Sequence, residues 1–206
     1  MSTPTDRRAG LTRAALELLE SEGPEAVSTR KVAARYGAST MAVYSEFGSL
    51  AGLVESVVGQ GFAMLAEALR RVPVTQDPVA DLVGIGRAYR QFARDHPHLY
   101  RVIYAVSPLA GHRRSGQELL QGADAFAMTQ EAVRRAYRAG RMSIGSPYVA
   151  TFQVWTAMHG MVVAELSGYL DAMPASDDDP LEALARTFAV GLGDDPARAS
   201  ASTQRA

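Results

Sequence analysis

Two short helical stretches separated by only three residues constrain the fold of this chain more than any other feature. Residues 29–36 and 40–47 carry apolar side chains at helical spacing, and Gly37-Ala38-Ser39 lies between them. Glycine can close a helix in the left-handed conformation, and a serine or threonine hydroxyl can cap the start of a helix. The sequence therefore predicts a helix-turn-helix, with Ser28 or Thr29 capping its first helix and Ser39 capping its second.

The rest of the pattern is also helical, so the fold class that we expect is all-α. Apolar residues return at spacings of three and four along almost the whole chain, without a sustained alternation of period two. We expect an N-terminal three-helix domain with the helix-turn-helix at residues 5–52, and a helical C-terminal domain at residues 53–192. Residues 193–206 lack an apolar period, so they are expected to form a disordered tail.

Composition and motifs exclude several classes of protein. The 206 residues include no cysteine, which excludes disulfides, thiolate metal sites and a cysteine nucleophile, and fits the cytoplasm. No apolar run approaches the roughly 20 residues of a membrane span, and no signal peptide is recognisable. His96-Pro97-His98 matches no zinc spacing, and no phosphate-binding or hydrolase motif occurs. We therefore expect no enzyme activity, no metal or other cofactor and no membrane association.

The charge of the helix-turn-helix domain is balanced. Residues 6–52 contain six basic and six acidic side chains, and the whole chain has a formal net charge of −1. Three of the basic side chains, Arg30, Lys31 and Arg35, belong to the first helix of the motif. Non-specific affinity for DNA depends on cations that neutralise phosphates. If the motif binds DNA, we therefore expect weak non-specific binding and a shallow dependence on salt.

Several residues of the N-terminal region occur together in one register. After an alanine-rich first helix they are Gly23, Thr29, Val32-Ala33, Gly37-Ala38-Ser39, Tyr44, Phe47 and Leu53. With this series the first 53 residues resemble the TetR family of transcriptional regulators. Two positions depart from the family pattern, because Glu46 stands where histidine or tyrosine is frequent and Leu50-Ala51 stands where lysine is frequent. Both departures remove positive charge.

The resemblance implies a double-stranded DNA operator as partner and assigns roles to individual residues. The implied DNA-binding residues are Ser28, Thr29, Arg30, Ser39, Thr40, Met41, Tyr44 and Ser45. Among these, Ser39, Thr40 and Met41 would lie nearest the bases, and Thr29, Arg30, Tyr44 and Ser45 would contact phosphates. Ala33, Val43 and Phe47 would belong to the core of the domain.

The second half of the chain resembles one class of TetR C-terminal domain. The similarity lies in Trp155-Thr-Ala-Met-His159-Gly160 and in the segment from Phe92 to Arg101. Aromatic and methionine side chains there could line a pocket for a small-molecule effector. The candidate ligand-binding residues are Tyr89, Phe92, Tyr100, Tyr104, Phe126, Phe152, Trp155, Met158 and His159. The alternative is that these side chains simply fill the core.

Apolar stripes on the last two expected helices exceed what a small domain needs to bury. A four-helix interface between two subunits would cover them, which makes a homodimer the expected assembly. The candidate interface residues are Val162, Leu166, Tyr169, Leu181, Leu184 and Phe188.

The function that we expect is that of a ligand-responsive regulator, most simply a repressor whose effector is a small apolar or aromatic molecule. The effector would shift the fourth helix and thereby change the spacing of the two reading helices. An activator or a repressor with a filled core remains open. Another alternative is a helical protein-interaction module that has lost DNA binding, for which Glu46 and the neutral first domain are the evidence.

Overall fold

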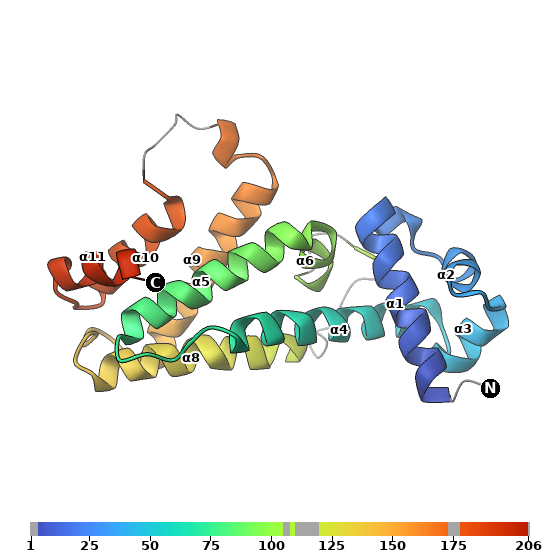
Figure 1. The fold of residues 1–206 in the computed structure, drawn as a ribbon, viewed down its shortest axis with the longest axis horizontal. Helices are drawn as coiled ribbons and strands as arrows, with labels where there is room; N and C mark the ends of the chain where they lie inside the picture. The colour runs from blue at the N-terminus through green and yellow to red at the C-terminus, as the bar shows by residue number, and fades with distance from the viewer. Residues whose placement is uncertain (1–3, 105–107, 110–119, 173–177, 206) are drawn as a thin grey trace. The chain divides into compact units, whose positions relative to one another are not determined.

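The computed structural model of the protein describes residues 4–104, 108–109, 120–172 and 178–205. Every secondary-structure element among these residues is a helix, as expected for the all-α class (Figure 1). The chain divides into two compact units. The first comprises Met1–Met64 and Asp95–Gly122, and the second comprises Leu65–Arg94 and Ala123–Ala206.

The first unit contains the predicted helix-turn-helix. It is built from α1 (Pro4–Glu22), η1 (Pro24–Ala26), α2 (Thr29–Tyr36), α3 (Thr40–Phe47), the first part of α4 (Leu50–Arg70), α6 (Pro97–Ile103) and η2 (Leu120–Gly122). α1 packs against α2, α3 and α6, and α2 packs against α3 (Figure 1). The side chains at its centre are at most 2% exposed and include Leu11, Ala15, Leu19, Val32, Ala33, Val43, Leu53, Leu99 and Ile103.

The turn between α2 and α3 closes largely as the sequence predicts. Gly37 adopts the left-handed conformation, with φ 79° and ψ 33°, and the Ser28 hydroxyl accepts a hydrogen bond from the Lys31 amide at 3.3 Å. Ser39 differs from the prediction, because it precedes α3 in an extended conformation but makes no capping bond with its side chain. Its backbone carbonyl accepts from the Ala42 amide at 3.0 Å instead, which leaves the exposed hydroxyl available for other partners.

The connection between α3 and α4 depends on a glycine. A Cβ atom at Gly52 would meet the backbone carbonyl oxygen of Phe47, whereas a Cβ at Gly59 in the same helix would meet nothing within 4 Å. We expect Gly52→Ala to lower the free energy of unfolding by about 1–3 kcal/mol, because a backbone oxygen cannot rotate away as a side chain can.

The matched control is Gly59→Ala, which removes the entropic penalty of a helical glycine and should stabilise the protein by up to about 1 kcal/mol. Chemical unfolding of the two variants measures both effects. Equal effects of the two substitutions would contradict the close approach at Gly52.

α4 is 21 residues long and is apolar enough to cross a membrane by length and composition. This differs from the expectation that no such run occurs. The buried core helix of a globular protein meets the same criteria, and Leu53, Val57 and Phe62 of α4 are each at most 5% exposed. We therefore interpret α4 as a core helix.

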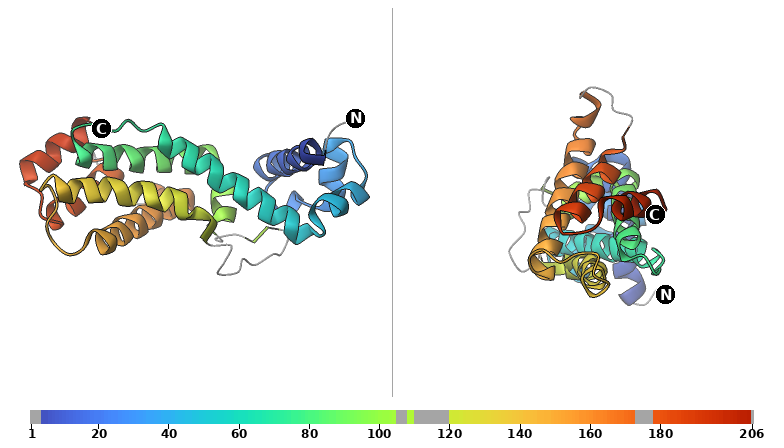
Figure 2. Two further views of the ribbon diagram at one scale, coloured as in Figure 1. Left: turned by 90° about the horizontal axis from the view of Figure 1, so that it is seen from below. Right: turned by 90° about the vertical axis from the view of Figure 1, so that its left-hand side faces the viewer.

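The second unit consists of packed helices. They are α5 (Pro78–Asp95, up to Arg94 within this unit), α8 (Ala123–Arg138), α9 (Pro147–Leu166), η3 (Leu170–Ala172), α10 (Pro180–Gly191) and α11 (Pro196–Arg205). α8 lies beside α9, and α10 packs against both α9 and α11 (Figure 2). One cluster of buried side chains joins these helices and contains Val79, Val133, Ala136, Met142, Ala150, Ala189, Leu192 and Ala199.

The prediction of a disordered tail at residues 193–206 is wrong for the part that the structure describes. Residues 196–205 form α11, in which Ala199, Ser202 and Thr203 are at most 1% exposed. Polar contacts hold this helix in place, because the Ser202 hydroxyl donates to Asp77 Oδ2 at 2.8 Å and Arg205 pairs with the same carboxylate at 2.7 Å. A search for apolar periodicity cannot detect a helix that is held by hydrogen bonds.

The division into compact units also differs from the predicted boundary at residues 52 and 53. The first unit takes in α4 as far as Met64 and adds the segment that begins at Asp95. α6 belongs to it because α6 packs on α1, with the Leu99 amide donating to the Glu20 carboxylate at 3.1 Å. A contact between segments 79 residues apart leaves no local signal in the sequence.

Candidate DNA-binding surface and effector pocket

One face of α3, formed by Thr40, Met41, Tyr44 and Ser45, points outward. Met41 is 72% exposed and Tyr44 is 47% exposed, which is unusual for large side chains on a short packed helix. All eight predicted DNA-binding residues lie at the surface: Ser39, Thr40, Met41, Tyr44, Ser45 and Arg30 are exposed, and Ser28 and Thr29 are partly exposed. Val43 and Phe47, on the opposite side of α3, are buried. α3 therefore has the outward face that a reading helix needs.

The positive charges of α2 are unequally available. The Lys31 ammonium lies 2.9 Å from Glu22 Oε2, and Arg35 pairs with Glu22 at 3.3 Å and with Glu17 at 3.8 Å. The hydrogen bond and charge of Lys31 lower the pKa of the Glu22 carboxyl. Arg30 takes part in none of the ion pairs found among the described residues, and its side chain is exposed. Arg30 is therefore the α2 cation best placed to meet a phosphate.

Glu46, the acidic departure from the family pattern, is engaged by the start of α1. Arg7 Nη1 lies 3.6 Å from Glu46 Oε1, and Arg8 donates a hydrogen bond to the Glu46 backbone carbonyl. The Arg8 guanidinium also lies 4.4 Å from the centre of the Phe47 ring, a cation–π contact. Arg8 thus attaches the start of α1 to the end of α3, and Arg7 offsets the negative charge of Glu46.

A chain of aromatic contacts links three helices of the second unit. Ring centroids of Tyr89 and Trp155 are 5.3 Å apart, those of Trp155 and Phe126 are 5.7 Å apart, and those of Phe126 and Tyr148 are 6.5 Å apart. All three pairs meet edge to face, an arrangement that aromatic rings prefer. The Tyr89 hydroxyl lies 3.0 Å from His159 Nδ1 and forms a hydrogen bond with it. These contacts bring together four of the predicted ligand-binding residues.

His159 should remain neutral at physiological pH. Burial lowers the pKa of its imidazole below the ordinary 6.5, because desolvation disfavours the charged form. The unfolded chain therefore binds the proton more readily than the folded one. The contribution of His159 to stability is present above pH 6.5 and is lost as the pH falls through that value towards the lower pKa of the folded state.

A proton NMR titration of the four imidazole rings tests this prediction. The resonance that disappears in His159→Gln should show a midpoint below 6.5 in the wild-type protein. A midpoint at or above 6.5 would show that burial does not govern this ring.

The second unit also contains a small apolar cavity between α5, α9 and α10, which none of Tyr89, Phe126, Trp155 and His159 lines. Met158, one of the predicted ligand-binding residues, lines it together with Gly86, Leu181 and Phe188. Its volume is about 30 Å³, whereas pockets that hold drug-sized ligands enclose roughly 300–1,000 Å³. This cavity is therefore too small for such a ligand in this conformation.

The remaining predicted ligand-binding residues are not all part of this arrangement. Phe92 is 5% exposed and belongs to the second unit, like Tyr89. Tyr100 and Tyr104 belong to the first unit, where their rings lie 4.9 Å apart and Tyr104 meets Phe62 at 5.6 Å. Phe152 needs correction as a pocket residue, because its side chain is 58% exposed on α9.

The predicted dimer interface also needs correction at two positions. Val162 is fully buried and Leu181 is 3% exposed, so neither side chain is available to a second subunit. Tyr169 is 61% exposed, and Leu166, Leu184 and Phe188 are partly exposed. Large apolar side chains that the sequence analysis did not assign to the interface are exposed on α9 and α10, namely Tyr148, Val149 and Val190.

Two further residues with a place in these sites were missed. Tyr148 extends the aromatic chain. The signal in the sequence was its position four residues before Phe152, which is helical spacing to a residue already assigned to the pocket. Arg8 fixes the end of α3 through contacts 38 residues away in the sequence, for which there was no signal.

Comparison with known proteins agrees with this architecture. Residues 11–57 match the pattern of the bacterial regulatory proteins of the tetR family, and residues 82–188 match that of the tetracyclin repressor-like C-terminal domain. An HTH-type transcriptional regulator of Mycobacterium tuberculosis, Rv0681, is 25% identical over 164 residues, which cover 80% of this chain and 72% of the relative.

Solved structures share the fold along nearly the whole chain. A protein of unknown function from Rhodococcus sp. RHA1 is 25% identical, with a TM-score of 0.77 over 94% of this chain and 97% of that one. The complex of RolR with resorcinol is 16% identical, with a TM-score of 0.71 over 98% of this chain and 95% of that one. The two matched patterns together cover both the helix-turn-helix and the helical C-terminal part. The chain therefore belongs to the TetR family of bacterial transcriptional regulators, with a helix-turn-helix domain followed by a helical C-terminal part.

Proposed function

We propose that this regulator is a repressor that binds a palindromic operator as a homodimer and is released by a small apolar or aromatic molecule. The exposed face of α3 is the observation that carries the proposal. Thr40 and Met41 offer a hydroxyl and a flexible apolar tip to the bases, and Arg30 offers an uncompensated cation to the phosphates. Base contacts from α3 combined with a phosphate contact from Arg30 are what a sequence-specific DNA-binding protein needs.

A homodimer would supply the second reading helix. Tyr148, Val149 and Phe152 of α9 are more than half exposed, and isolated soluble domains rarely leave such side chains together in water. A second subunit would cover them together with Tyr169. Two-fold symmetry then presents two α3 helices to half-sites spaced by about 34–36 Å, one turn of DNA.

The effector would enter the second unit beside Tyr89, Trp155 and His159. The Tyr89 hydroxyl and the neutral His159 ring are hydrogen-bonded to each other, and both could instead bond to the hydroxyl of a phenol. The edges of the Tyr89 and Trp155 rings would pack against the aromatic ring of such an effector. RolR, which shares the fold, binds resorcinol, an aromatic molecule of this kind. The apolar cavity that Met158 lines holds only about 30 Å³, so an effector that also occupied this cavity would select a more open state, and its differential affinity for that state would drive release.

α4 would transmit the change, since this one helix begins in the first compact unit and ends in the second. One of the two grounds for a protein-interaction module is weakened, because the Glu46 carboxylate lies beside Arg7 rather than being left to repel DNA. The other ground, the neutral charge of the first domain, stays.

Selection of genomic fragments by the purified protein, followed by sequencing, tests the proposal. One enriched palindromic site is expected, and the Thr40→Ala/Met41→Ala variant should not enrich it. Failure of the wild-type protein to enrich any site would refute the proposal. In-vitro transcription from the enriched site should fall when the protein is added, and a rise would make it an activator.

A further inference from the structure

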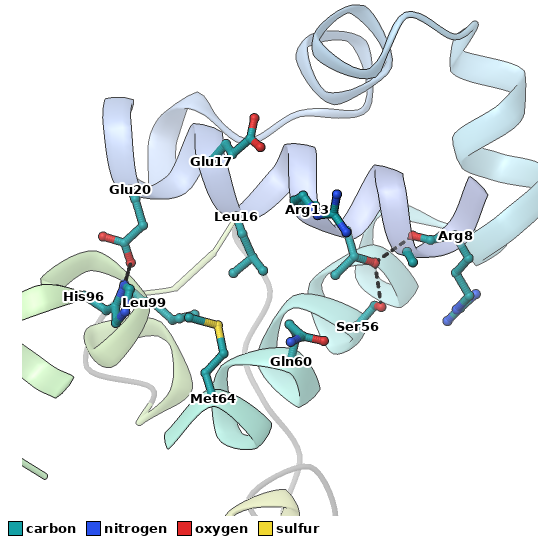
Figure 3. Close-up of a pocket in the computed structure, with 12 residues that line it drawn as sticks. Arg8, Arg13, Leu16, Glu17, Glu20, Ser56, Gln60, Met64, His96 and Leu99 are labelled. Atoms are coloured by element: carbon teal, nitrogen blue, oxygen red, sulfur yellow. Dashed lines mark hydrogen bonds and ion pairs between the residues drawn. The ribbon is translucent and has the colours of Figure 1, made fainter. Parts of the chain in front are cut away.

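A cavity of the first unit lies between α1, α4 and α6. It encloses about 650 Å³ and is open to solvent at one side, a volume within the range of small-molecule sites. Figure 3 shows the helices around it, with side chains of α1 facing those of α4 and α6. All the residues that line it belong to one compact unit.

The middle of this cleft is apolar with a few polar groups. Leu16 extends from α1 into the space between the helices, and Met64 of α4 extends towards Leu99 of α6 (Figure 3). A methionine adapts its shape to different ligands because it is unbranched and polarisable. On one side, the Thr12 and Ser56 hydroxyls are hydrogen-bonded to each other at 2.9 Å, and the Thr12 hydroxyl also donates to the Arg8 backbone carbonyl at 3.0 Å. The apolar side chains in the middle of the cleft can therefore contact the apolar part of a ligand.

Charged side chains of both signs line the cleft, with Arg8 and Arg13 farther along α1 and the carboxylates of Glu17 and Glu20 towards the other end (Figure 3). Glu20 stands beside a histidine rather than an arginine or lysine. The Glu20 carboxylate accepts the Leu99 amide at 3.1 Å and lies 3.8 Å from His96 Nδ1, towards which it points in Figure 3. Among the described residues, no ion pair joins Glu20 to an arginine or lysine. Burial raises the pKa of Glu20 despite the nearby histidines. A cation bound at this end would favour the charged carboxylate and so offset the cost of its desolvation.

We propose that this cleft binds a small organic cation with an apolar body, whose protonated amine pairs with Glu20 while the body lies on Leu16, Met64 and Leu99. The site goes beyond the proposed function, because it is formed by the unit that carries the helix-turn-helix and it selects a positive charge. α1, which supplies most of its lining, packs directly on α2 and α3.

Calorimetry on the full chain with three probes of one shape tests the proposal. The probes are 4-phenylbutylamine, the neutral 4-phenylbutan-1-ol and the anionic 4-phenylbutyrate. We expect the amine to bind at least about tenfold more tightly than the alcohol, and the butyrate to bind more weakly than both. In Glu20→Gln, whose amide oxygen can still accept the Leu99 amide, the preference for the amine should disappear while the affinity for the alcohol stays unchanged.

A second pair of variants locates the site. Gln60 is exposed on α4 and lines the cleft, so Gln60→Trp should fill the cleft without disturbing the core and abolish binding of the amine. Gln153→Trp makes the same change at an exposed position of the second unit and should leave binding intact. An amine that binds no better than the alcohol, or that binds Glu20→Gln or Gln60→Trp as tightly as wild type, would overturn the proposal. No DNA is present, so the result does not depend on the proposed operator.

Discussion

Replacing Arg141 by methionine is expected to lower the free energy of unfolding by about 3–5 kcal/mol. The Arg141 side chain is 4% exposed and lies against an Asp194 carboxylate that is 1% exposed. Both oxygens of Asp194 accept from the guanidinium at 2.6 Å. Methionine matches the volume but leaves Asp194 as a buried charge without its cation, which costs far more than the loss of one hydrogen bond.

The same guanidinium also joins the segment before α5 to the C-terminal helix α11. It donates to Asp77 at 2.8 Å and to the Ser202 hydroxyl of α11 at 2.9 Å. Burial by itself would raise the pKa of Asp77, but hydrogen bonds from Ser202, the Ala80 amide and Arg205, with the charge of Arg141, hold it well below the usual range. Loss of Arg141 should therefore loosen α11 as well, which faster amide exchange in residues 196–205 would report.

Two controls separate the buried charge from other effects. Arg138→Met removes a pair with Glu131 whose side chains are 67% and 52% exposed, and should change stability by at most about 1 kcal/mol. Arg141→Met combined with Asp194→Leu removes both buried charges, and should recover much of the loss. Urea unfolding measures all three variants, and a loss below about 1 kcal/mol for Arg141→Met would contradict the assigned role of the ion pair.

The helix-turn-helix could be predicted closely from the sequence because its determinants are local. Gly37 closes α2 and Ser28 caps it through contacts within four residues. The burial of Val43 and Phe47 follows from the helical period of α3. Ser39 is the exception. Its side chain makes no capping hydrogen bond, because the Ala42 amide donates to the Ser39 backbone carbonyl instead.

The C-terminal part could be predicted only as a set of helices. The partners of Arg141 lie 53, 61 and 64 residues away, and nothing local indicates that they meet. α9 carries apolar residues on its inward and outward sides, so that Val162 is buried while Phe152 is exposed. Periodicity cannot choose between these faces, which explains why the sequence predicted the wrong exposure for Phe152 and for Val162.

The final prediction concerns how DNA recognition divides between Arg30 and Met41. Met41→Ala should weaken binding to the operator by about 1–3 kcal/mol, roughly 5- to 150-fold, and leave binding to unrelated DNA unchanged, because the exposed Met41 tip is placed to touch bases. Arg30→Ala should weaken both alike and reduce the salt slope by about 0.9, because a phosphate contact carries no sequence information. Fluorescence anisotropy over a range of salt concentrations measures both quantities.

Arg35→Ala provides the internal comparison, since this arginine already pairs with Glu17 and Glu22. Its removal frees those carboxylates rather than a phosphate, so we expect a smaller change in salt slope than for Arg30→Ala. If Arg35→Ala changed the slope as much as Arg30→Ala, the ion pairs of α2 would open on DNA, and the near-neutral domain would bind through charge after all. If Met41→Ala weakened binding to all sequences equally, α3 would be a backbone contact and not the reading helix. The balance of charge around the motif thus makes fit at the bases, rather than bulk attraction, the expected source of operator affinity.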